Sequence, residues 1–249
     1  MPRQGVRRKQ RERAAAKKVL QKNAKPQSTA NDISKRRGGA STKCQPADME
    51  AALSSSSRPN EKLFELANRP SVCVNVGGMP LKVLQDLKTQ EHSGGVVWET
   101  SLFLLRYLQH QVLPGLRSER KRERLRVVEL GSGCGLLGLG LGCLGCKVVL
   151  TDQPCALENL HTNAEAQTSE GNLVAPEVLP LSWGDSDDIA AVCSKGPFDL
   201  VVGSDVVFAT RLVEPLLQTI LALMEDSGSC WLCLQRRDPD AHDLLLSKA

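Results

Sequence analysis

Short apolar runs alternate with longer amphipathic stretches through the second half of the chain. Leu125–Leu130 is a nearly continuous apolar run, as expected for a strand that is buried on both faces of a parallel sheet. Further strands are predicted at 147–151 and within 175–183, 198–208 and 229–235. Apolar residues at helical spacing predict helices at 154–166 and 211–225. This alternation indicates a doubly wound α/β fold with a parallel sheet and helices on both faces.

A β-hairpin is predicted ahead of this alternating region. Ser71–Val76 and Leu81–Gln85 read as strands, and the Gly77-Gly78 pair between them suits a tight turn. From about Glu99 onward, leucine and aromatic residues recur at helical spacing. The charged run Ser118–Arg124 is predicted to be a surface link.

The first part of the chain differs sharply in charge from the rest. Residues 1–45 contain 14 Lys and Arg against 2 acidic residues, a net charge of +12, whereas the whole chain carries +4, so the remainder carries −8. A basic segment with few large apolar residues cannot bury enough surface to offset its ordering entropy. We therefore expect a disordered basic tail at 1–59 and one folded domain at 60–249.

The basic run Arg7–Arg13 is compatible with a nuclear address, an RNA-contacting arm or a plain solvated tail. An Arg-rich, acid-poor start is also compatible with an organelle transit peptide. No apolar run approaches the ~18 residues of a membrane span, and no signal-peptide core is present. We expect a monomer in the cytoplasm, the nucleus or both, without membrane attachment.

Nine cysteines are present, and two pairs, Cys143–Cys146 and Cys230–Cys233, have the CxxC spacing of a zinc half-site. Each pair lies in an apolar stretch without a nearby histidine. Because free cysteine packs as a small hydrophobic residue, we expect core positions and no metal.

The glycine-rich stretch VVELGSGCGLLG (127–138) lies between the first predicted parallel strand and the following helix, where such sheets bind their ligands. The third glycine of a dinucleotide fingerprint would fall at Leu136, and the carboxylate of Glu129 would lie close to a diphosphate. Asp152, 21 residues after Gly131, ends the second strand, where a carboxylate can accept hydrogen bonds from both ribose hydroxyls. The pattern favours S-adenosyl-L-methionine, a cation without phosphate, over NAD; a glycine turn without any ligand is the other alternative.

Five blocks then resemble the family 16 methyltransferase-like proteins, which are seven-β-strand, S-adenosylmethionine-dependent protein-lysine methyltransferases. The blocks occur in the family's order: VVWET (96–100), VVELGSGCGLLGL (127–139), VVLTDQPCALENL (148–160), LSWGD (181–185) and FDLVVGSDVVF (198–208). The resemblance covers about Phe64 to Leu234. It implies a Rossmann-like methyltransferase sheet that carries the N-terminal hairpin as an extension, and a lysine side chain of a protein as substrate.

The resemblance also implies which residues hold the cofactor: Trp98, Gly131, Ser132, Gly133, Asp152, Trp183 and Ser204. Glu129 is a further candidate from its place two residues before the glycine turn, where a cationic ligand tolerates a carboxylate. Trp98 and Trp183 could instead be ordinary core residues. The family's D-x-x-Y motif matches Asp205 to Phe208, so the aromatic ring is kept and its hydroxyl is lost. We expect Asp205 to orient the lysine amine and Phe208 to form an apolar wall. The alternative for Asp205 is the N-cap of the following helix.

The family sheet ends in an antiparallel hairpin, and the residues after the fifth strand, RRDPDAHDLLLSKA, are too few for a helix and two strands. We therefore expect the sheet to lack its last hairpin, as in a truncated or divergent short form. This absence and Phe208 favour an alternative, a non-catalytic binding protein that keeps the fold. A third candidate is an RNA methyltransferase that uses the basic tail.

Overall fold

The computed structural model describes residues 66, 68–88, 93–120, 124–169 and 176–248. The predicted tail at 1–59 lies outside these residues, so that division of the chain stays a prediction.

Five parallel strands form the central sheet, in the order β5-β4-β3-β6-β7. Their bounds are β3 Arg126–Leu130, β4 Lys147–Asp152, β5 Glu177–Pro180, β6 Phe198–Ser204 and β7 Met224–Cys233. Each lies where the apolar pattern predicts a strand, although β5 fills only the middle of its predicted range. The doubly wound α/β fold is confirmed.

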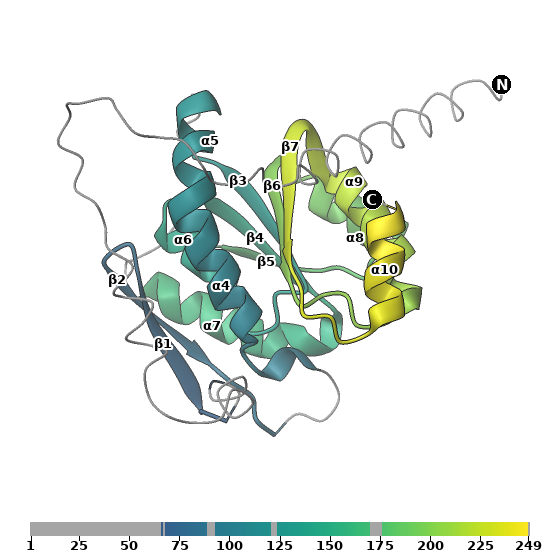
Figure 1. Cartoon of the computed structure of the whole chain (residues 1–249). Coiled ribbons are helices and arrows are strands. Elements are labelled where there is room, and N and C mark those ends of the chain that lie inside the picture. The colour runs from purple at the N-terminus through teal and green to yellow at the C-terminus, as the bar shows by residue number, and fades with distance from the viewer. Residues whose placement is uncertain (1–65, 67, 89–92, 121–123, 170–175, 249) are drawn as a thin grey trace, which may run out of the picture.

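Helices cover both faces of this sheet (Figure 1). One face carries α4 Glu99–Tyr107, α5 Leu113–Arg120, α6 Leu136–Cys143 and α7 Leu157–Ser169. The opposite face carries α8 Ser186–Cys193, α9 Val213–Leu223 and α10 Pro239–Lys248. Short 3-10 turns are η1 Ser93–Gly95, η3 Pro154–Ala156 and η4 Thr210–Leu212.

Successive residues of the central strands serve two separate cores. Val127 and Leu200 belong to the core under α4, α6 and α7, whereas Val128 and Val201 belong to the core under α8 and α9. All four side chains are fully buried. A strand with both faces covered needs apolar residues at every position, which is why the sequence shows continuous runs here rather than alternation.

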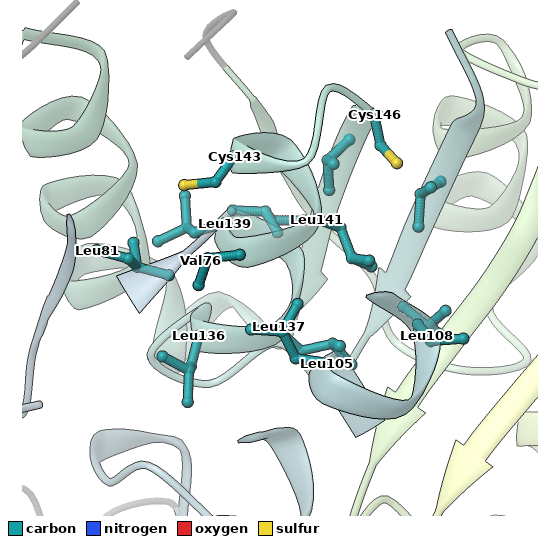
Figure 2. Close-up of a cluster of buried hydrophobic side chains, with 14 of the residues drawn as sticks. Val76, Leu81, Leu105, Leu108, Leu136, Leu137, Leu139, Leu141, Cys143 and Cys146 are labelled. Carbon is teal, nitrogen blue, oxygen red and sulfur yellow. The ribbon is translucent and has the colours of Figure 1, made fainter. Parts of the chain in front are cut away.

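The predicted hairpin is confirmed as β1 Ser71–Val76 and β2 Met79–Leu84, which pair antiparallel. Gly77 and Gly78 form its turn with φ of 61° and 88°, the left-handed backbone that such a two-residue turn requires. Figure 2 shows Val76 and Leu81 of the hairpin among the leucines of α6, with Leu105 on the other side. The hairpin thus extends the first core and does not join the central sheet.

The prediction of a surface link at 118–124 is wrong in part, because α5 continues to Arg120. A wide π-type turn, η2 Leu108–Val112, joins α4 to α5. Pro114 is the second residue after this turn. Proline has no N–H and its ring clashes with the carbonyl four residues earlier, so the wider turn lets the helical path continue past it.

Two boundaries near the C-terminus differ from the prediction. β7 begins at Met224, so α9 ends before 225 and the strand starts five residues earlier than expected. Met224 pairs with Phe198 and Ser229 with Leu200, so the residues between them form an irregular bulge. After β7 the chain forms α10, and within the described ranges β6 is the one strand that pairs with β7. No helix of the described segments is long and apolar enough to cross a membrane.

Candidate functional site

The chain reverses its direction of winding between β3 and β6. From β3 it proceeds outward through β4 to β5, and then returns to place β6 on the other side of β3. Sheets of this kind bind their ligands in the crevice outside the carboxyl ends of the strands at such a switch point. The segments that follow β3 and β6 are therefore where a ligand is expected.

The glycine turn after β3 is closely packed on two sides. Gly131, Gly133 and Gly135 have φ of 64°, 54° and 85°. A Cβ on Gly131 would lie 3.1 Å from Cγ1 of Val206, and one on Gly133 would lie 3.2 Å from the carbonyl oxygen of Gly94. Only glycine combines this backbone with such close approaches. The turn therefore lies between the segment after β6 and the segment before α4.

The end of β4 holds this turn in place. The Gly133 N–H donates to Oδ2 of Asp152 at 2.7 Å, and the Gln153 N–H donates to Oδ1 at 2.7 Å. The buried Ser132 hydroxyl accepts from the Thr151 N–H at 3.1 Å. Asp152 thus lies at the predicted strand end and also fixes the turn. The hydroxyl of Ser132 is hydrogen-bonded to the backbone of β4.

Glu129 lies beneath the turn with 1% of its surface exposed. Its Oε2 accepts from the Gly138 N–H at 3.0 Å, which satisfies one of the open donors of the first turn of α6. Burial raises the pKa of Glu129 to about 8, although hydrogen bonds from Ser132 and Gly138 oppose the rise. Its carboxyl group is therefore mostly protonated at neutral pH. The expectation that its negative charge disfavours a diphosphate is corrected, while its contact with a cofactor stays a prediction.

Both predicted tryptophans lie beside the site and are half-buried. Cζ2 of Trp183 is 3.5 Å from where a Cβ of Gly131 would lie, and the ring also packs against the second core. Trp98 immediately precedes α4, and its Nε1 donates to the carbonyl of Ser93 at 3.2 Å. Trp183 therefore combines a core position with contact to the glycine turn.

Asp205 follows β6 in the left-handed conformation, with φ of 57°. Its Oδ1 accepts from the Gln235 N–H at 3.0 Å, and its Oδ2 accepts from Nε and Nη2 of Arg237 at 2.9 and 2.7 Å. The same guanidinium lies 4.4 Å from the ring centroid of Trp98. Only 4% of the Asp205 side chain is exposed. A cation thus already bridges the predicted amine-orienting carboxylate and a predicted cofactor residue.

The remaining predicted residues of this segment lie at the same edge. Ser204 is the last residue of β6, paired with Cys233. Phe208 exposes 48% of its surface. The alternative role for Asp205 as a helix cap is wrong, because the next helical turn, η4, begins at Thr210 with Ala209 as its N-cap.

A family model described as "Lysine methyltransferase" matches residues 77–247, well over half of the chain. The chain belongs to the lysine methyltransferase family. Every site residue predicted from the sequence, from Trp98 to Phe208, lies within the match, and so does Arg237.

Curated relatives carry related names. Protein N-lysine methyltransferase METTL21A of Danio rerio is 33% identical over 50% of this chain and 53% of its own length. The EEF1A lysine methyltransferase 3 of Xenopus tropicalis is 32% identical over 64% and 66%, respectively. METTL21A of Mus musculus is 30% identical over 72% and 78%. The match therefore spans about half of the length of the first of these lysine methyltransferases and more than three quarters of the last.

Two residues of the site were not predicted from the sequence. Arg237 lies 32 positions after Asp205 and outside every family block, and nothing in its neighbourhood along the chain marks it. Asn163 of α7 is fully buried and joins the hairpin to the glycine turn. Its Oδ1 accepts from the Leu84 N–H at 2.8 Å, and its Nδ2 donates to the carbonyls of Leu84 and Cys134 at 2.9 and 3.0 Å. Polar side chains at helical spacing, Asn159, Asn163 and Gln167, were the available signal.

Two cysteines border the site, because Cys134 lies in the glycine turn and Cys233 pairs with Ser204. In the part of the chain that the structure describes, no group of three or more His, Cys, Asp or Glu side chains could hold a metal ion. Cys143 and Cys146 are buried in the first core, and burial raises the pKa of Cys146 to about 11. A thiol with so high a pKa is a poor nucleophile and metal ligand at neutral pH.

Proposed function

We propose that this protein is an S-adenosyl-L-methionine-dependent protein-lysine N-methyltransferase. Family membership supports the reaction class, and the convergence of the glycine turn, Asp152 and Trp183 at the switch point is the single structural observation that supports the location of the site. The names of the curated relatives support a lysine side chain of a protein as the methyl acceptor.

The residues at this edge suit S-adenosylmethionine in their chemistry. The missing side chains at Gly131 and Gly133 let a ligand approach the backbone. Each oxygen of a carboxylate can accept more than one hydrogen bond, so Asp152 can hold the turn and also accept from a ribose diol. Trp183 offers a ring face against which an adenine could stack. The bound cofactor would supply the methyl group on a sulfonium.

The protein must then place a neutral amine in line with that methyl group. A free lysine, with a pKa of about 10.4, is almost entirely protonated at neutral pH. A partly desolvated site and a neighbouring positive charge both favour its neutral form. In our proposal Asp205 orients the amine and Phe208 forms the apolar wall, as the family resemblance suggests.

Binding of the cofactor to the full chain is the first test. We expect Asp152→Ala to raise the dissociation constant of S-adenosylmethionine by roughly tenfold or more, because a charge-assisted hydrogen bond contributes about 1.5–3 kcal/mol. Isothermal titration calorimetry measures this, with Asp187→Ala, which removes an exposed carboxylate in α8, as the matched control. Equal affinities in all three proteins, or no binding by the folded wild type, would contradict the proposed cofactor site.

Methyl transfer is tested separately with radiolabelled cofactor and a panel of lysine-rich proteins. The panel includes EEF1A, the substrate named for the Xenopus tropicalis relative, and amino-acid analysis of the labelled product should give methyllysine. A non-catalytic protein is favoured by Phe208 and by the engagement of Asp205 with Arg237. That alternative predicts cofactor binding without transfer, and no gain on Phe208→Tyr.

We also propose that the protein is a monomer and that it is located in the cytoplasm or nucleus; the basic run Arg7–Arg13 supports the location. A fluorescent fusion in which the arginines of this run are replaced by glutamine tests the location. Loss of nuclear accumulation would indicate a nuclear address, and an unchanged distribution would indicate a plain solvated tail.

A further inference from the structure

Arg237 lies in the middle of the candidate site and has no part in the proposed reaction. Its guanidinium lies over the ring of Trp98 and donates twice to Oδ2 of Asp205. An aromatic face and a carboxylate are the two groups that proteins use to hold an organic cation. Trp98 and Asp205 come from segments 107 residues apart, and the fold brings both of them to one cation.

We propose that Asp205 and Trp98, the latter in place of the cofactor contact that the resemblance implies for it, form the subsite for the cationic side chain of the acceptor lysine, and that Arg237 occupies this subsite until the substrate displaces it. The inference rests on the proposed function, because it names the subsite that the methyl acceptor uses. It concerns docking of the protonated lysine, which precedes loss of its proton to solvent.

Burial supports an exchange of cations. Asp205 exposes 4% of its side chain and Arg237 exposes 31% of its own, so the guanidinium covers the carboxylate from the solvent side. A buried carboxylate left alone is strongly unfavourable, whereas one cation replacing another keeps the charge paired. Replacing Arg237 by the incoming ammonium therefore costs less free energy than removing Arg237 and leaving Asp205 unpaired.

Arg237 can leave without unfolding its surroundings. It lies in the short connection between β7 and α10, and α10 has anchors of its own. Oδ1 of Asp238 accepts from the Asp240 and Ala241 N–H groups, and Ala241 is fully buried against the second core. The bond from the Gln235 N–H to Oδ1 of Asp205 does not involve the guanidinium. Rotation of one side chain is enough to open the subsite.

The experiment compares full-length wild type with Arg237→Ala and with Arg236→Ala, a neighbouring exposed arginine that pairs with Asp243. Each ¹⁵N-labelled protein is saturated with S-adenosylhomocysteine, which fills the cofactor site without adding a sulfonium. The Trp98 indole N–H signal, assigned with Trp98→Phe, is followed by NMR during titration with Nα-acetyl-lysine methylamide. Nα-acetyl-norleucine methylamide is the uncharged probe.

We expect saturable shifts of the Trp98 signal in Arg237→Ala, with half-saturation at a probe concentration about tenfold or more below that of wild type and Arg236→Ala. The norleucine probe should not reproduce them. Arg237→Gln, which keeps a donor for Asp205, should lower the half-saturating probe concentration by a smaller factor. It replaces the alanine variant if that variant does not fold.

Equal half-saturation in the three proteins, or no response in a folded Arg237 variant, would overturn the proposal. Loss of S-adenosylhomocysteine binding in both Arg237 variants would also overturn it, because Arg237 would then support the cofactor residues rather than compete with substrate. Calorimetry on wild type before any probe is added shows whether the cofactor site exists at all, so failure of the proposed function is recognised separately.

Discussion

Glu129 carries its carboxyl group in the interior of the protein, next to the first turn of α6, and its pKa is raised from 4.5 to about 8. Between these two values the folded protein holds a proton that the unfolded chain has lost. The free energy of unfolding must therefore fall as the pH rises from about 4.5 to about 8. Above pH 8 the folded protein contains a buried, desolvated charge.

Glu129→Gln should remove this pH dependence, because the amide keeps the size of the side chain and its oxygen can still accept from Gly138. We expect the variant to become more stable relative to wild type as the pH rises, by a few kcal/mol in all. Urea unfolding at pH 5.5 and pH 8.5 measures the difference. If wild type and Glu129→Gln differ in stability by the same amount at both pH values, the Glu129 carboxyl does not titrate in this window.

Gly138 shows how little room is left above Glu129. A Cβ at this position would lie 2.2 Å from Cδ2 of Leu150 and 2.6 Å from Oε2 of Glu129. Gly138→Ala should destabilise the protein by about 1–3 kcal/mol through overpacking. Gly115 in α5 is the matched control, since a Cβ there meets nothing within 4 Å. Gly115→Ala should stabilise the helix by up to about 1 kcal/mol.

Thermal or urea unfolding of both alanine variants tests the contrast. A Gly138→Ala protein as stable as wild type would mean that the strand can shift to admit the methyl group. Gly140 faces another element, because a Cβ there would lie 2.4 Å from Cδ2 of Leu105 in α4 rather than against the sheet. The sequence indicates that these glycines allow close packing, but not against which partner.

At the scale of elements, α7 binds the backbone of β2 through a row of amide side chains. Asn159 and Asn163 donate to the Leu84 carbonyl, and Gln167 donates to the Lys82 carbonyl. Of these, Asn163 also reaches the carbonyl of Cys134 in the glycine turn. The hairpin and the glycine turn are therefore both hydrogen-bonded to α7 through the same side chain.

Asn163→Ala should remove the partner of the Leu84 N–H and of the Cys134 carbonyl, whereas the Leu84 carbonyl keeps Asn159. We expect a cost of about 1–3 kcal/mol for a buried unsatisfied group. The same variant should bind S-adenosylmethionine more weakly, because the Cys134 carbonyl is no longer fixed. Chemical unfolding and calorimetry measure the two effects, with the exposed His161→Ala on the same helix as control. If Asn163→Ala is destabilised but binds the cofactor as tightly as wild type, the glycine turn keeps its geometry without its bond to Asn163.

The elements themselves were largely predictable. Strands β3, β4 and β6 are continuous apolar runs because helices cover both of their faces, and Gly77-Gly78 specifies its turn locally. The extension of the helix through Pro114 and the early start of β7 at Met224 were not predictable. The early start of β7 depends on its pairing with β6 across a bulge. The helix continues past Pro114 because a π turn precedes the proline, and the apolar pattern does not show such a turn.

At the scale of the whole molecule, one sheet separates two cores, and the same strands supply both. Loss of packing on one face removes support from the other, which favours a single cooperative unfolding transition. The site draws on residues from both halves of the sheet, with Asp152 as the last residue of β4 and Asp205 directly after β6. The motifs predicted that both residues lie at the ends of strands, which the structure confirms, while their roles stay predictions. The contact of Arg237 with Asp205 arises only from the path of the chain after β7.

The bonds of Asn163 have a consequence for regions far from the cofactor. Thermodynamic coupling is reciprocal, so a ligand that steadies the glycine turn must also steady whatever the turn is bonded to. The N–H of Leu84 at the end of the hairpin is one step from the turn through a single amide side chain. Its hydrogen exchange should therefore slow when the cofactor site fills, so that an amide in the hairpin reports on binding at the glycine turn.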